Sequence, residues 1–218
     1  RFQSDYIDLY LLHRDDPRVP VGPIVEALNE HLRAGRIRAF GGSNWTHERI
    51  GEANAYAAAR GLVGFAVTSP QLSLAEMVEP LWLGCVGLGG PSGRAGREWY
   101  ARHRVPVFAW SSLGRGFLSG RFRRGEPGPA AGPEDEAILR SFGSADNFTR
   151  LERAQTLAAE KGVKLPQIAL AYVLSLPLEV FPLTGCLSGA EFQENLAALT
   201  LRLTPREIAW LDLESDER

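Results

Sequence analysis

The chain has 218 residues, of which 44% are hydrophobic and 23% are charged, and its net charge is −2. This length and composition favour one domain with a substantial core. Acidic and basic residues are interspersed, so nothing indicates a nucleic-acid partner, and no apolar run is long enough to predict a membrane span. Cys85 and Cys186 lack metal-ligand spacing and are expected to be free thiols in a reducing compartment, which predicts a cytoplasmic protein.

The beginning of the chain is unusual for a natural domain. Arg1 comes first, and a predicted strand follows within five residues. The opening residues do not show the basic and then apolar pattern of a signal peptide. We therefore expect residues 1–218 to be one piece of a longer polypeptide.

Strands and helices are predicted to alternate along the chain. The strand at 6–13 becomes wholly apolar and is expected to be buried. A helix at 22–34 follows, and Gly35 stands where a C-cap glycine belongs. Thr46 and Thr204 are the expected N-caps of two later helices. The remaining strands are expected at 37–44, 65–69, 105–110 and 179–185, and the remaining helices at 46–60, 97–104, 148–161, 166–176, 190–199 and 205–213.

Two stretches interrupt this alternation. Residues 74–96 contain an apolar loop, and residues 123–146 are rich in glycine, proline and charge. Loops of this length are usually functional lids or disordered segments. Because the composition of 123–146 cannot bury a core, this second stretch is expected to be disordered.

Five strand–helix repeats predict a parallel sheet with helical crossovers. A doubly wound open sheet and part of a (β/α)8 barrel both fit this pattern. The first strand is not followed by Gly-x-Gly-x-x-Gly, which weakens the nucleotide-binding doubly wound alternative. Polar residues gather at the carboxyl ends of the predicted strands, where barrel enzymes build their sites.

Five motifs, in order and spacing, resemble the aldo-keto reductases. They are DYIDLYLLH at 5–13, GRIRAFGGSN at 35–44, WSSLGRGFLSG at 110–120, QIALAYVL at 167–174 and LTGCLS at 183–188, the last leading to Glu194 and Asn195. The resemblance covers the whole chain. It implies one α/β domain over residues 1–218: a partial (β/α)8 TIM barrel of about five parallel strands with outer helices, which lacks the N-terminal strand–helix units. The family's catalytic Asp, Tyr and Lys lie in those units.

The resemblance assigns His13 to catalysis. In the family this histidine donates a hydrogen bond to the substrate carbonyl, and a neutral imidazole suits that task because it polarises an oxygen without adding charge. The alternative is a histidine at a strand end whose hydrogen bonds are made within the protein and which has no catalytic role.

The resemblance also implies a site for NAD or NADP. Ser43 and Asn44 would bind the nicotinamide carboxamide, and Trp110 would stack on the ring. Ser69 stands where the family usually has a glutamine, and Gln71 can substitute if the strand end shifts. The next loop would wrap the pyrophosphate with backbone N–H groups and one arginine, through residues Ser111, Ser112, Leu113, Gly114, Arg115 and Gly116.

A second loop is expected to bind phosphate, ribose and adenine. Gly185, Cys186 and Ser188 precede a helix N-terminus, where anions bind readily, and Glu194 and Asn195 match the family pair that contacts adenine. Leu187 and Glu191 replace the basic residues that often bind the 2′-phosphate. The sequence therefore favours NAD, without excluding NADP.

Three functions follow as hypotheses. The first is an NAD(P)H-dependent oxidoreductase that reduces aldehydes or ketones to alcohols, with a small-molecule partner, no nucleic acid, no membrane and an upstream segment that completes the domain. The second is a non-catalytic relative that binds nucleotide or acts as a scaffold. The third is a bare fragment without independent function. The sequence upstream of Arg1 distinguishes them, because the enzyme requires Asp, Tyr and Lys there.

Overall fold

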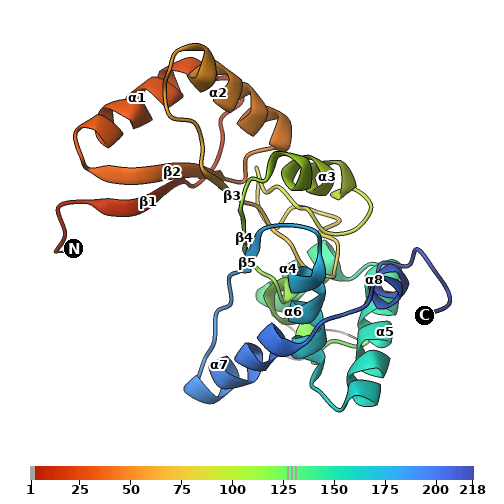
Figure 1. The fold of residues 1–218 in the computed structure, drawn as a ribbon. Coiled ribbons are helices and arrows are strands. Elements are labelled where there is room, and N and C mark those ends of the chain that lie inside the picture. Colours follow the sequence, from red (N-terminus) through yellow and green to blue (C-terminus); the bar gives the residue numbers. More distant parts are fainter. Residues whose placement is uncertain (1–2, 127, 129, 131) are drawn as a thin grey trace.

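A computed structural model describes residues 3–126, 128, 130 and 132–218. Within them, five strands form one parallel sheet in sequential order, as predicted. Since each strand runs parallel to the one before it, the chain crosses back over the sheet after every strand. Figure 1 shows helices accompanying these crossings. The strands are β1 (Ile7–Leu12), β2 (Ile37–Ser43), β3 (Val67–Ser69), β4 (Val107–Ala109) and β5 (Val180–Pro182).

Eight α-helices and two short 3-10 segments lie in the described residues. None of these helices is both long and apolar enough to cross a membrane. The α-helices are α1 (Val21–Arg33), α2 (His47–Ala59), α3 (Arg94–His103), α4 (Pro133–Phe142), α5 (Ala145–Lys161), α6 (Leu165–Ser175), α7 (Gly189–Leu196) and α8 (Pro205–Leu211), and the 3-10 segments are η1 (Gly114–Ser119) and η2 (Ala197–Thr200).

The local signals for helix ends were correct. Thr46 accepts a hydrogen bond from the Arg49 backbone N–H, and Thr204 caps α8 in a reciprocal box with Glu207. Gly35 has a φ of +69° after α1, a conformation that glycine adopts at little cost. Two helices start about one turn earlier than predicted: α3 begins at Arg94, and α5 begins at Ala145.

Two apolar clusters hold the sheet to its helices. The smaller joins β2 with α1 and α2 around Phe40, Trp45 and Ile50. The larger packs α4, α5, α6 and α8 against β4 and against the loop that follows β3. Trp99 on α3 contacts both clusters. Figure 1 shows α1 and α2 together over β1 and β2, while α4 to α8 gather around the later strands.

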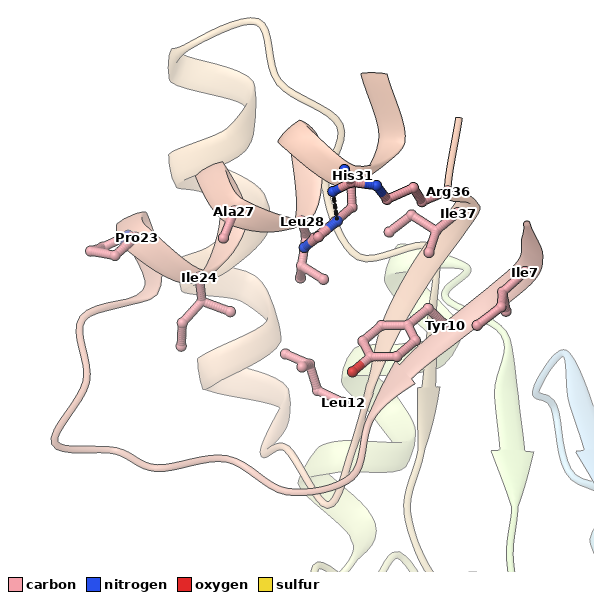
Figure 2. Close-up of a pocket in the computed structure, with 10 residues that line it drawn as sticks. All are labelled: Ile7, Tyr10, Leu12, Pro23, Ile24, Ala27, Leu28, His31, Arg36 and Ile37. Carbon is pink, nitrogen blue, oxygen red and sulfur yellow. Dashed lines mark hydrogen bonds between the residues drawn. The ribbon is translucent and has the colours of Figure 1, made fainter. Parts of the chain in front are cut away.

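The expectation that the first strand is buried was wrong. Ile7 and Tyr10 on β1 are exposed, because among the described residues β1 pairs only with β2 and is therefore an edge strand. A hollow of about 590 Å³ lies between β1 and α1. Figure 2 shows that Tyr10, Leu12, Ile24 and other mostly apolar side chains line it.

The expectation of disorder over 123–146 was also wrong for most of this stretch. Pro133 begins α4, where its missing N–H has no consequence, and three acidic residues in the first turn suit the helix dipole. Ile138 and Phe142 lie four residues apart and are fully buried in the larger cluster. Composition concealed this short amphipathic pattern. Residues 127, 129 and 131 lie outside the described residues.

Candidate cofactor site at the strand ends

A row of hydrogen bonds joins the carboxyl ends of the first four strands. The Asn44 side-chain amide donates to the His13 carbonyl oxygen at 3.3 Å and to Ser43 Oγ at 3.2 Å. Ser43 Oγ in turn donates to the Ser69 carbonyl at 2.8 Å, and Ser69 Oγ donates to the Phe108 carbonyl at 2.8 Å. The predicted residues His13, Ser43, Asn44 and Ser69 are thus neighbours.

These bonds give the two serines a structural role. Ser43 and Ser69 are buried, and each hydroxyl proton is used on a carbonyl of the neighbouring strand. A buried carbonyl without a donor costs about 1–3 kcal/mol, so these hydroxyls stabilise the ends of the ladder. Each hydroxyl retains only acceptor capacity toward a ligand.

His13 differs from its neighbours because it is exposed. Its backbone carbonyl accepts from Asn44, and the residue lies directly after the carboxyl end of β1. The imidazole is therefore accessible to a small molecule that approaches the strand ends.

Trp110 follows β4 and stacks on Trp82, with ring centroids 5.3 Å apart and an interplanar angle of 18°. The indole Nε1 atoms of both tryptophans are buried without a partner. Gln71 lies beside them, since its backbone bridges to Trp110 and to Gly87. The Gln71 side chain is fully buried, with Nε2 donating to Ser73 Oγ at 2.9 Å and Oε1 left without a partner.

The amide of Asn44 is already engaged within the chain. Its Oδ1 accepts a hydrogen bond from the Val86 backbone N–H at 3.2 Å, while its Nδ2 donates as described above. Asn44 has a φ of +56°, which asparagine tolerates better than most residues. This backbone conformation belongs to the chain's turn from β2 toward α2.

The loop after β4 is wound tightly. Ser111, Gly114, Arg115 and Gly116 all have positive φ values. Ser112 Oγ donates to the Ala109 carbonyl at 2.9 Å, and Leu113 packs against the larger cluster. The Arg115 guanidinium pairs with Glu134 on α4 at 3.1 Å, so its charge is partly neutralised.

The second predicted loop lies away from this row. Figure 1 shows the connection from β5 to α7 running away from β1 and β2. Gly185 is exposed, and Ser188 caps α7 by accepting from the Glu191 backbone N–H. The Glu191 carboxylate accepts from the Leu187 backbone N–H at 2.7 Å. The adenine pair is also engaged: Glu194 forms an ion pair with Lys164, and Asn195 Nδ2 lies 3.3 Å from Cys186 Sγ.

A nicotinamide dinucleotide fits only part of this arrangement. An alanine Cβ at Gly185 or Gly189 would have no atom within 4 Å, so this loop leaves room for a ligand. At the other end, Trp82 covers one face of Trp110, and the Val86 N–H already donates to Asn44 Oδ1. A nicotinamide ring therefore cannot stack on that face of Trp110 while Trp82 lies there.

The large hollow in Figure 2 is a separate feature. It is lined by β1 and α1 residues such as Tyr10, Leu12 and Ile24 and includes none of the predicted site residues. In the described residues, no group of three His, Cys, Asp or Glu side chains is placed to hold a metal. Both cysteines are free.

Sequence reasoning gave Gln71 a secondary place, as a substitute for Ser69. In the structure the Ser69 hydroxyl donates to a carbonyl of the neighbouring strand, whereas the buried Gln71 Oε1 has no hydrogen-bond partner. The available sequence signal for Gln71 was an amide side chain two positions after a predicted strand. No periodic pattern in the sequence predicted the contact of Trp82 with Trp110.

Comparison with known proteins identifies the class of this fold. Residues 1–213 match the Aldo/keto reductase family, and the chain belongs to that family of oxidoreductases. The crystal structure of a thermostable aldo-keto reductase in complex with the inhibitor epalrestat superposes with a TM-score of 0.70 and 21% identity, covering 98% of this chain and 61% of that one. This likeness supports the α/β barrel-type fold.

Individual relatives have different names. A probable voltage-gated potassium channel subunit beta from Arabidopsis thaliana is 28% identical over 94% of this chain and 60% of its own length. The uncharacterized oxidoreductase YrpG of Bacillus subtilis is 27% identical over 93% of this chain and 56% of its own length. Norsolorinic acid reductase A of Aspergillus parasiticus is 28% identical over 97% of this chain and 49% of its own length. The chain thus spans between about half and three-fifths of these relatives' lengths.

Proposed function

We propose that this protein is an NAD(P)H-dependent oxidoreductase that reduces aldehydes or ketones to alcohols. The observation that carries the proposal is the exposed His13, tied to Asn44 at the carboxyl ends of β1 and β2, in a chain of the Aldo/keto reductase family. Barrel enzymes build their active sites at this edge of the sheet. A cytoplasmic location belongs to the same proposal and is supported by the two free cysteines.

In this proposal His13 polarises the substrate carbonyl by donating an N–H to its oxygen. The proton itself must come from another group. Tyr100 is unsuited, because it is buried with its hydroxyl 3.3 Å from Thr68 Oγ1, and burial raises its pKa to about 12. We assign the proton donor to a tyrosine outside residues 1–218, together with the Asp and Lys that the family resemblance implies.

The open edge of β1 supports a longer barrel. Ile7 and Tyr10 are exposed there, and the adjoining hollow is mostly apolar. A preceding strand–helix unit would pair with β1 and cover these side chains, which removes apolar surface from water. Such a unit would also bring its own strand end beside His13.

A second candidate is a non-catalytic relative that binds nucleotide or acts as a scaffold. Two observations favour it: the Trp82 ring that covers one face of Trp110, and a relative named as a probable voltage-gated potassium channel subunit. The sequence upstream of Arg1 separates the candidates. Asp, Tyr and Lys at strand ends there would support the enzyme.

The test uses the protein at its full natural length with a panel of aldehydes and ketones and both reduced cofactors. We expect His13→Ala to lower the rate of carbonyl-dependent cofactor oxidation by about 10²–10³-fold, the usual effect of losing one donor to the reacting oxygen. His103→Ala, at an exposed position on α3, is the matched control and should leave the rate unchanged. Equal rates for wild type and His13→Ala would contradict the role of His13.

A further inference from the structure

We propose that the Trp82 side chain is a gate that occupies the nicotinamide position on Trp110 and swings away when the cofactor docks. This inference rests on the proposed function, because it requires a nicotinamide dinucleotide to bind at the strand ends. The gate is carried by the arm of the loop between β3 and α3, residues 82–85, in which Leu83 and Gly84 are exposed and Trp82 is half-buried.

The first observation is the stack itself. The two indole planes lie within 18° of parallel with centroids 5.3 Å apart, which is the geometry of an offset aromatic pair. A nicotinamide ring on the same face of Trp110 would need the same space. Cofactor ring and Trp82 are therefore mutually exclusive at this position.

The second observation is that the closed arrangement leaves polar atoms without partners. Trp82 Nε1, Trp110 Nε1 and Gln71 Oε1 are all buried and unpaired. Each such atom costs free energy when it is withdrawn from water. The carboxamide of a docked nicotinamide carries N–H donors, and Gln71 Oε1 is an acceptor of the kind they need. Movement of Trp82 out of the stack would return its own Nε1 to water.

The third observation is that the loop has one fixed end and one free arm. At the fixed end, Gln71 N donates to the Val86 carbonyl at 2.8 Å, Leu88 N donates to the Gln71 carbonyl at 2.8 Å, and Val86 N donates to Asn44. In the arm, Leu83 is 91% exposed and Gly84 has a φ of +82°. Such a glycine can absorb the backbone rotation of a hinge.

The arm is held by weak surface contacts. Arg14 lies over the Trp82 ring at 5.6 Å from its centroid and donates to the Leu83 carbonyl at 3.2 Å, in an exposed position. Exposed contacts of this kind contribute little, so they can break when a ligand competes. At the fixed end the Val86 N–H stays bonded to Asn44 Oδ1. Trp82 can therefore move while the rest of the loop keeps its hydrogen bonds.

The test compares two ligands of the full-length natural protein. NADH contains the nicotinamide ring, whereas ADP-ribose carries the adenosine, pyrophosphate and ribose without it. Removing the gate with Trp82→Ala is expected to tighten NADH binding by about 2- to 10-fold, the range that corresponds to the loss of one aromatic pair. ADP-ribose binding should not change. Leu83→Ala, on the same arm, is the matched control and should alter neither dissociation constant.

Two further measurements guard the interpretation. Trp82→Leu keeps apolar bulk without a flat ring and replaces Trp82→Ala in the test if the alanine variant folds poorly. It is expected to tighten NADH binding in the same way. In the wild type, near-ultraviolet circular dichroism should lose the signal of the stacked indoles as NADH is added but not as ADP-ribose is added. Retention of that signal at saturating NADH would contradict the gate.

The outcomes separate the gate from the proposed function. If NADH binds and both Trp82 variants leave its affinity unchanged or weaken it, then Trp82 is no gate, while the proposed function stands. If none of NADH, NADPH and ADP-ribose binds to wild type or variants, the proposed function fails and the gate fails with it.

Discussion

The two ends of the proposed dinucleotide site use their polar groups in opposite ways. At the strand-end row, Ser43, Asn44 and Ser69 are buried and bonded to neighbouring strands or to Val86. At the β5–α7 loop, Gly185 and Leu187 are exposed, and Leu187 and Ser188 bond locally, to Glu191 on α7. The first end is built by tertiary contacts and the second by helix capping.

This difference indicates where ligand binding meets resistance. A ligand that stacks on the covered face of Trp110 must displace the Trp82 ring. A ligand at the β5–α7 loop meets open space beside Gly185 and Gly189.

Catalysis provides the largest expected effect, because the proposed function assigns the proton donor to a tyrosine outside residues 1–218. The 218-residue chain purified by itself should reduce carbonyls at least about 10²-fold more slowly than the protein at its full natural length, since a positioned acid–base group typically contributes 10²–10⁴-fold. Cofactor oxidation followed with the same substrate panel measures this. Robust turnover by the isolated chain would mean that the chemistry has been assigned to the wrong residues.

Glycine substitutions compare the packing of the two ends directly. A Cβ at Gly41 would lie 2.4 Å from the Val67 carbonyl oxygen of the neighbouring strand, so Gly41→Ala should lower the free energy of unfolding by about 1–3 kcal/mol. A Cβ at Gly185 would meet no atom within 4 Å, so Gly185→Ala should change it by less than about 0.5 kcal/mol. Urea unfolding of both variants gives the two values. Equal losses would contradict the contrast between the ends.

The smallest expected effect concerns the choice of cofactor at the exposed end. The Glu191 carboxylate accepts a hydrogen bond from the Leu187 N–H. Its negative charge would repel a 2′-phosphate nearby, so wild type should favour NADH. Glu191→Lys should shift the ratio of dissociation constants toward NADPH by about tenfold, or about 1.4 kcal/mol. Glu191→Gln removes the charge but keeps an acceptor, and it should give a smaller shift. A wild-type preference for NADPH of tenfold or more would show that this loop does not read the 2′ position as proposed.

Local signals in the sequence determined most of the secondary structure. Alternating strands and helices predicted the sequential parallel sheet, and Gly35, Thr46 and Thr204 predicted helix ends that the structure contains. These features depend on residues within one or two turns of each other, so local sequence patterns are sufficient to predict them. The motifs at the strand ends also predicted the family correctly.

Tertiary structure alone decided which of the site's groups are free. The Ser69 hydroxyl is used on β4, and Gln71 keeps an unpaired acceptor, because hydrogen bonds between strands depend on register rather than on residue type. Trp82 lies 28 positions before Trp110 in a loop without periodicity, so no local pattern encodes their stack. Burial on β1 likewise depends on which strand pairs with its outer edge, and this is a property of the assembled sheet rather than of the apolar run itself.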